Sequence, residues 1–188
     1  VTGVQTCALP ICCKAIAVPL DAQSTKKEIE YVINDCRPDI VFISEDKQEM
    51  FKDINLQGAR LFTKNDILLS DSEEIPATDI PLGDDNATML INYTSGTTGN
   101  PKGVMLSFRN VMFNVDSVSK QVPIFQEDSS VMMLLPVHHI LPLLGSVVAP
   151  LYMGGTVHIA EAMNAESIIK TLNAGAVSII IGVPRLYD

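Results

Sequence analysis

The residue types that could do chemistry are concentrated in residues 93–103, which read YTSGTTGNPKG. The glycines in this run can adopt positive φ, so that successive backbone N–H groups point at phosphate oxygens. Hydroxyl groups that can donate to an oxyanion, or ligate a metal ion through oxygen, are carried by Thr94, Ser95, Thr97 and Thr98. Lys102 adds a positive charge, and Pro101 stiffens the approach to it. The segment therefore predicts a site that holds phosphate groups.

Two better-known phosphate loops do not match this segment. A P-loop, GxxxxGK[ST], needs Gly before its Lys and Ser or Thr after it, whereas Pro101 and Gly103 flank Lys102. The dinucleotide fingerprint GxGxxG does not occur in the segment. The remaining alternative is a flexible Gly/Thr/Ser turn between core elements, which the length and specificity of the run disfavour.

The elements on either side would present this loop to a ligand. Ala87 to Tyr93 reads as a strand that leads directly into the loop. Ser107 is a candidate N-cap for a helix with an apolar face formed by Phe108, Val111, Met112, Val115 and Val118. We expect strand, loop and helix in succession, an arrangement that directs backbone N–H groups at an anion.

The rest of the chain alternates between strand-like and helix-like segments. Thr25 and Glu28 form a capping-box signature for a helix that ends before Pro38 and has Ile29, Val32, Ile33 and Cys36 on one face. Predicted strands cover 15–20, 40–44, 131–135, 156–159 and 177–181, and further helices cover 141–152 and 165–172. Residues 15–44 read as a β-α-β unit, and residues 64–85 as a polar surface connection. The alternation predicts an α/β fold, a mostly parallel layered sheet with helices on both faces.

Residues 93–103 resemble the phosphate-binding signature of the AMP-binding, adenylate-forming superfamily, and the resemblance extends over the chain from Cys12 onward. It implies that a carboxylate attacks the α-phosphate of ATP to give an acyl-adenylate, and that a thiol such as CoA then displaces AMP. ATP and Mg²⁺ are the implied cofactors, with CoA and a small carboxylic acid as substrates. The residues implied to hold the ATP phosphates are Thr94, Ser95, Gly96, Thr97, Thr98, Gly99 and Lys102, with Thr94 also a ligand of Mg²⁺.

A second segment, Leu135 to His139, resembles the family's following motif, in which an aromatic residue or His near a strand end lines the acyl and adenylate pocket. The resemblance gives His139 that place, and we expect it to shape or gate the pocket rather than to transfer protons. Without the family context, such a His is more often a satisfied core or loop residue. We expect His138 to be structural and His158 to be a strand residue without a role. One departure is Phe108, where the family often has His.

Residues 151–156 and 182–187 resemble segments of fatty acyl-CoA synthetases, which predicts a fatty or other apolar acid as substrate. The apolar run 132–151 is compatible with such a substrate, although an aliphatic stripe is more often core than tunnel. An adenylation domain that activates amino acids or aryl acids remains an alternative. A non-catalytic nucleotide-binding module is another.

The composition excludes some partners. A net charge of −9 disfavours sequence-independent binding to nucleic acid or to an anionic membrane. No charged residue lies between Asp128 and Glu161, which is longer than the roughly 20 residues of a membrane helix, but Pro136, Pro142 and Pro150 interrupt this stretch. We expect no transmembrane segment, while peripheral membrane association stays open. Scattered cysteines without CxxC spacing indicate a reducing cytoplasm.

The sequence divides into a short N-terminal segment, residues 1–11, and a single partial domain, residues 12–188. Residues 1–11 resemble the in-frame translation of a sequencing-library adapter, and we expect them to be non-native. Residues 12–188 are expected to form part of the large N-terminal domain of an adenylate-forming enzyme. The family's adenine- and ribose-binding segments and its mobile C-terminal domain are not in the sequence. We therefore expect the isolated chain to be inactive, and poorly soluble through exposed edge strands.

Overall fold

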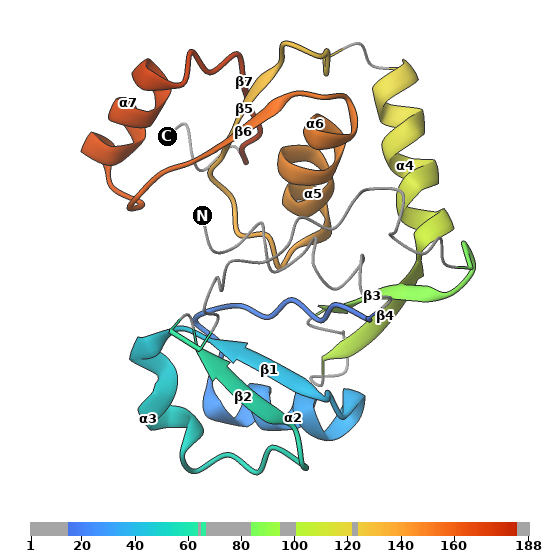
Figure 1. The fold of residues 1–188 in the computed structure, drawn as a ribbon, viewed down its shortest axis with the longest axis vertical. Helices are drawn as coiled ribbons and strands as arrows, with labels where there is room; N and C mark the ends of the chain where they lie inside the picture. Colours follow the sequence, from blue (N-terminus) through green and yellow to red (C-terminus); the bar gives the residue numbers. More distant parts are fainter. Residues whose placement is uncertain (1–14, 64, 67–83, 95–100, 122–123, 184–188) are drawn as a thin grey trace.

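The computed structural model describes residues 15–63, 65–66, 84–94, 101–121 and 124–183, whose arrangement is shown in Figure 1. A first group of elements consists of α2 (Lys26–Cys36), β1 (Ile40–Ile43), η1 (Glu45–Lys47), α3 (Gln48–Phe51) and β2 (Arg60–Thr63). A hairpin follows, made of β3 (Thr88–Thr94) and β4 (Lys102–Ser107). The second group consists of α4 (Phe108–Gln121), β5 (Ser130–Met133), α5 (Ile140–Leu143), η3 (Leu144–Val148), α6 (Ala149–Tyr152), β6 (Thr156–Ile159), α7 (Ala165–Ala174) and β7 (Ile179–Ile180).

The strands form three small sheets within the described residues, and two of these sheets are parallel. β1 pairs with β2, and β5 lies between β6 and β7, all in parallel. The β3–β4 hairpin is antiparallel. Parallel strands alternating with helices confirm the predicted α/β fold, and the antiparallel hairpin is the exception to a parallel arrangement.

The first group is built around α2. The predicted capping box is present, since Glu28 N donates to Thr25 Oγ1 at 3.4 Å and Thr25 N donates to Glu28 Oε2 at 2.7 Å. These contacts from Thr25, first its backbone N–H and then its hydroxyl, lower the pKa of the Glu28 carboxyl. The helix buries Ile29 and Ile33 against Phe51 and Ile54. Arg37 ends it in the left-handed conformation, directly before Pro38.

The predicted β-α-β unit at residues 15–44 is wrong in its pairing. Ala17 makes only a single parallel bridge to Leu90 of β3, so no strand forms at 15–20. β1 pairs instead with β2. The sequence did not predict β2, because this strand has only four residues, RLFT, which mix polar and apolar side chains. The crossover between these parallel strands runs through η1 and α3.

A second correction concerns the element that follows residues 95–100. The predicted helix begins at Phe108, directly after its predicted cap, but the sequence did not predict β4, which lies between residues 95–100 and this helix and returns antiparallel to β3. The glycine-rich loop therefore closes a hairpin rather than opening a helix. The cap is present at Ser107, as predicted: Asn110 N donates to Ser107 Oγ at 3.2 Å and Ser107 N donates to Asn110 Oδ1 at 3.0 Å.

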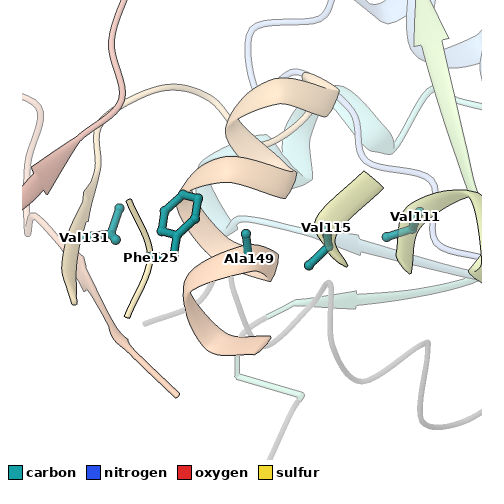
Figure 2. Close-up of a cluster of buried hydrophobic side chains, with 5 residues drawn as sticks. All are labelled: Val111, Val115, Phe125, Val131 and Ala149. Atoms are coloured by element: carbon teal, nitrogen blue, oxygen red, sulfur yellow. The ribbon is translucent and has the colours of Figure 1, made fainter. Parts of the chain in front are cut away.

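The core of the second group lies between α4, α6 and β5. Figure 2 shows five of its buried side chains in a row: Val131, Phe125, Ala149, Val115 and Val111. The strand predicted at 156–159 appears with these bounds, and the strands predicted at 131–135 and 177–181 and the helix predicted at 165–172 appear with shifted bounds. Among the described residues, no helix is long and apolar enough to cross a membrane.

The predicted helix at 141–152 forms as three consecutive helical segments, α5, η3 and α6. Its middle segment, η3, is a π-helix. Pro142 lies in the first turn, where a missing backbone N–H removes no helical bond. Pro150 would crowd the carbonyl four residues earlier in a regular α-helix, and the wider π turn before it relieves that contact. Both prolines are therefore compatible with one helical run.

Candidate functional site

The open end of the β3–β4 hairpin carries the predicted phosphate-binding residues. Thr94 and Lys102 are direct Cα partners in the hairpin, and both side chains are exposed. The segment between them contains Ser95, Gly96, Thr97, Thr98 and Gly99, which lie outside the described residues. The structure thus places the two ends of the predicted loop side by side.

Strand alternation decides which way these side chains point. Directly opposed residues of an antiparallel pair share a face, and every second residue along a strand returns to it. Asn92 therefore shares a face with Thr94 and, through the Thr94 pairing, with Lys102. We call this face, defined by these three residues, the site face of the hairpin.

The site face is joined to the segment that contains His139. Asn92 Nδ2 donates to the backbone oxygen of His138 at 2.9 Å, across 46 residues of sequence. Asn92 itself is only 6% exposed. Since Thr94 and Lys102 lie on the same face as Asn92, the open end of the hairpin faces the side on which the His138–His139 segment lies.

His139 occupies the N-cap of α5 with an extended backbone, and its side chain is exposed. Its ring lies 4.1 Å from the ring of His138, centroid to centroid. His138 Nε2 in turn lies 3.7 Å from Asp21 Oδ2. Burial, followed by the neighbouring His139, lowers the pKa of His138, while Asp21 acts in the opposite direction. His138 is therefore held mainly neutral at pH 7, consistent with the structural role expected for it.

The opposite face of the hairpin is fixed to the first group of elements. Tyr93 Oη donates to Asp35 Oδ2 at 2.6 Å. Burial, and then this bond to Asp35, raise the pKa of the Tyr93 hydroxyl. Tyr93 is also the direct partner of Gly103, and a Cβ added to Gly103 would lie 3.1 Å from the tyrosine ring. The last residues of β3 are therefore held on both faces.

Sequence reasoning missed the residues that connect the predicted site to the rest of the molecule. Asn92 had a detectable signal, because it is a polar residue inside the apolar run MLINY of a predicted strand. Asp21 and Asp35 gave no such signal, because nothing in the sequence around them relates them to Tyr93 or His138, which lie far away in the sequence. His158, expected to have no role, packs its ring where a Cβ on Gly175 would stand, with Nδ1 at 2.6 Å.

The described part of the site fits a magnesium–nucleotide complex. Lys102 offers a cation, and the residues that the structure describes give it no ion-pair partner. Thr94 offers an exposed hydroxyl oxygen, the type of ligand that Mg²⁺ accepts. Within the described ranges, no group of three or more His, Cys, Asp and Glu side chains is placed so that it could hold a metal ion. The Thr94 hydroxyl oxygen and the phosphate oxygens of ATP are groups that could ligate Mg²⁺ there.

The described end of the hairpin thus carries one hydroxyl, on Thr94, and one ammonium group, on Lys102, within an α/β fold. The chain belongs to the family described as AMP-binding enzyme, because that family's sequence profile matches residues 12–188. This confirms the superfamily that residues 93–103 predicted.

Curated relatives in this family are acid–CoA ligases. The chain is 25% identical over 179 residues to the mitochondrial malonate–CoA ligase ACSF3 of Homo sapiens, covering 92% of this chain and 31% of that protein. It is 28% identical over 175 residues to a feruloyl-CoA synthase of Amycolatopsis, covering 93% and 34%. It is 32% identical over 104 residues to the long-chain-fatty-acid–CoA ligase ACSBG2 of Homo sapiens, covering 55% and 16%. The matched part of the chain thus spans between 16% and 34% of the length of these relatives.

Solved structures share the fold. ATP-bound MatB from Rhodopseudomonas palustris superposes with a TM-score of 0.78 at 24% identity, covering 96% of this chain and 37% of that one. The MenE O-succinylbenzoate coenzyme A synthetase from Bacillus subtilis, in complex with ATP and a magnesium ion, gives 0.79 at 21%, covering 97% and 37%. These likenesses confirm that the elements described above have the arrangement found in such enzymes.

Proposed function

We propose that this chain carries the phosphate-binding part of an ATP-dependent ligase that converts a carboxylic acid into an acyl-adenylate and transfers the acyl group to CoA. The observation that carries the proposal is the pairing of Thr94 with Lys102 at the open end of the hairpin. These side chains lie on the face that Asn92 joins to the segment containing His139. Groups suited to phosphate and a residue suited to a pocket wall therefore face the same side.

Each residue has a distinct part in the proposed reaction. The Lys102 ammonium neutralises the triphosphate and the charge that develops on the leaving pyrophosphate. Thr94 and the backbone N–H groups of the loop orient the phosphates, with the Thr94 hydroxyl as a ligand of the metal. Magnesium bound with ATP supplies charge neutralisation at the phosphate oxygens. His139 shapes the pocket in which the acid carboxylate meets the α-phosphate, so its part is positioning rather than proton transfer.

The contribution of Lys102 is tested in the complete ligase that contains this segment. We expect Lys102→Ala to lower acid-dependent ATP–pyrophosphate exchange about 10- to 100-fold, as loss of a charge-assisted contact predicts. Lys102→Arg keeps the charge and should retain more activity than the Ala variant. Lys120→Ala is the matched control, because Lys120 is exposed and pairs with Asp116 on α4. Equal loss in the Lys102 and Lys120 Ala variants contradicts the assignment.

The proposal also extends to the class of carboxylic acid that the ligase activates. We propose a fatty or other apolar acid, supported by the resemblance of residues 151–156 and 182–187 to fatty acyl-CoA synthetases and by the similarity to ACSBG2, which is named for long-chain fatty acids. The relatives named for malonate and ferulate favour other acids. Pyrophosphate exchange should therefore be measured across fatty acids of increasing length, dicarboxylic acids, aryl acids and amino acids. Exchange confined to the last three classes would overturn the fatty-acid assignment.

We also propose that the 188-residue chain alone neither forms adenylates nor binds ATP tightly, and that the complete ligase works in the cytoplasm, with peripheral membrane contact left open. The support is that the chain spans about a third of the length of the relatives it matches, and a part of a binding site realises only part of the binding energy. Isothermal titration that shows micromolar ATP affinity for the isolated chain would overturn the first part. Fractionation of cells producing the complete ligase tests the second.

A further inference from the structure

Asn92 is a buried polar side chain in an otherwise apolar strand. It is 6% exposed and follows the apolar residues Leu90 and Ile91 in β3. Its amide nitrogen donates to His138 O at 2.9 Å. A backbone carbonyl can only accept, so the contact fixes which end of the amide faces His138. A purely structural position in this strand would be served better by an apolar residue, because burying an amide is unfavourable unless the amide is bonded.

The hydrogen bond of Asn92 connects the two halves of the proposed site. Asn92 lies two residues before Thr94 on the site face, and its acceptor lies one residue before His139. A leucine would fill a similar volume but would set neither the distance nor the orientation between these segments. The amide therefore determines where His139 stands relative to the loop that begins at Thr94.

The strand end that bears Asn92 is itself well anchored. On the opposite face, Tyr93 bonds Asp35 at 2.6 Å and lies over Gly103. The other described polar contact to His138, from Asp21 at 3.7 Å, involves a half-exposed carboxylate. Such exposed ion pairs contribute little and are screened by salt. The buried bond from Asn92 is thus the more rigid connection to the His138–His139 segment.

We propose that Asn92 is a positioning residue for acyl-adenylate formation. Its amide holds His138 and His139 beside the open end of the hairpin, where the ATP phosphates and the acid carboxylate must meet. Asn92 contacts none of the reacting atoms and acts through the placement of His139. The inference rests on the proposed ligase function.

The kinetic test uses the complete ligase with Asn92→Leu, which removes the donor, and Asn92→Gln, which keeps it on a side chain one methylene longer. We expect the Leu variant to lower kcat for pyrophosphate exchange, per folded enzyme, about tenfold with little change in KM for ATP. The Gln variant should recover part of that loss. Asn114→Leu is the matched control, since Asn114 is exposed on α4. Equal rates in the Leu and Gln variants, or unchanged rates in both, overturn the proposal.

A second readout does not require turnover. In enzyme labelled with ¹³C at histidine Cε1, ATP with Mg²⁺ should shift the His139 resonance, which is assigned by its loss in His139→Gln. We expect Asn92→Leu to abolish the shift and Asn92→Gln to retain it. If the unmodified enzyme shows no ATP–pyrophosphate exchange with any acid, the proposed ligase function is wrong. The change in the His139 resonance on adding ATP then decides by itself whether Asn92 positions His139. No shift in the unmodified enzyme, or the same shift in Asn92→Leu, overturns the positioning role.

Discussion

At the scale of single residues, Gly103 shows how tightly the base of the phosphate loop is built. Gly103 lies directly opposite Tyr93 in the hairpin. A Cβ at this position would approach Ile91 Cγ2 to 2.8 Å and the Tyr93 ring to 3.1 Å. The glycine is therefore required by close packing on the face opposite Thr94 and Lys102, rather than by an unusual backbone conformation.

We expect Gly103→Ala to lower the free energy of unfolding by about 1–3 kcal/mol, as overpacking does. Urea denaturation followed by circular dichroism measures this loss. Ile91→Ala removes the nearest atom, so the double variant should lose less than the sum of the two single variants. Strict additivity would show that the contact with Ile91 is not the cause.

Some site residues could be located from the sequence, whereas the contacts between distant parts of the site could be found only from the fold. Residue types and spacing in 93–103 sufficed to predict a phosphate loop, because glycine, hydroxyl and lysine each have a chemical reason to be there. They could not indicate that Asn92 binds the carbonyl of His138, since the bond spans 46 residues and depends on tertiary packing. The positions of Ser95 through Gly99 remain predictions, because they lie outside the described residues.

At the scale of elements, the turn between α6 and β6 contains two glycines with different requirements. Gly154 has φ of +84°, and a Cβ there would make only an ordinary van der Waals contact, at 3.9 Å from Glu127 Cγ. Gly155 has ordinary φ, but its Cβ would lie 2.7 Å from the backbone oxygen of Ser129 and 3.2 Å from that of Pro150. Gly155 N also donates to Pro150 O at 2.8 Å. The first glycine relieves conformational strain, and the second allows α6 to pack against the start of β5.

We expect Gly154→Ala to cost about 1–2 kcal/mol, the penalty for a left-handed non-glycine residue. Gly155→Ala should cost more, because backbone atoms on both sides must move apart. Thermal unfolding of the two variants under the same conditions compares them directly. The same or a smaller loss in Gly155→Ala would mean that the turn can shift without disturbing β5.

Element prediction succeeded where local signals agree with packing. The capping box at Thr25 and Glu28 and the periodic apolar positions of α2 and α4 located both helices. The strand predicted at 15–20 reduces to the bridge at Ala17, and β4 was read as part of the loop and helix region. Strand pairing is non-local, so an apolar run does not reveal its partner or its direction.

At the scale of the whole molecule, the described surface carries exposed apolar side chains next to an open strand edge. Met105 on β4 is 65% exposed and Phe113 on α4 is 75% exposed. Within the described residues, β4 pairs only with β3. An unpaired edge with apolar neighbours favours association between chains.

We expect the isolated chain to self-associate as its concentration rises, with a weight-average mass above 20.4 kDa in sedimentation equilibrium. Met105→Lys combined with Phe113→Lys places charges at this surface and should shift the distribution towards monomer. Asn114→Lys adds charge on an exposed part of α4 and serves as the control. If the double variant self-associates as the unmodified chain does, the self-association interface does not include Met105 and Phe113.

The partly buried His138 gives the stability of the whole molecule a pH dependence near neutrality. His138 faces Asp21 from the N-terminal segment and His139 from its own segment. Burial and His139 hold its pKa below the usual 6.5. The unfolded chain therefore binds more protons than the folded chain between these two pKa values, and stability falls as pH drops through that interval. The capped carboxylate of Glu28, with its lowered pKa, loses its contribution only in a more acidic range.

We expect the urea midpoint of unfolding to fall as the pH is lowered from about 7.5 to about 5, starting near the unfolded histidine pKa. His138→Gln removes the titrating group and should flatten this part of the profile while leaving the more acidic carboxylate range unchanged. Asp21→Asn removes the charge that opposes the lowered pKa, so its profile should fall more steeply. A His138→Gln profile parallel to that of the unmodified chain would assign the acid sensitivity to another group.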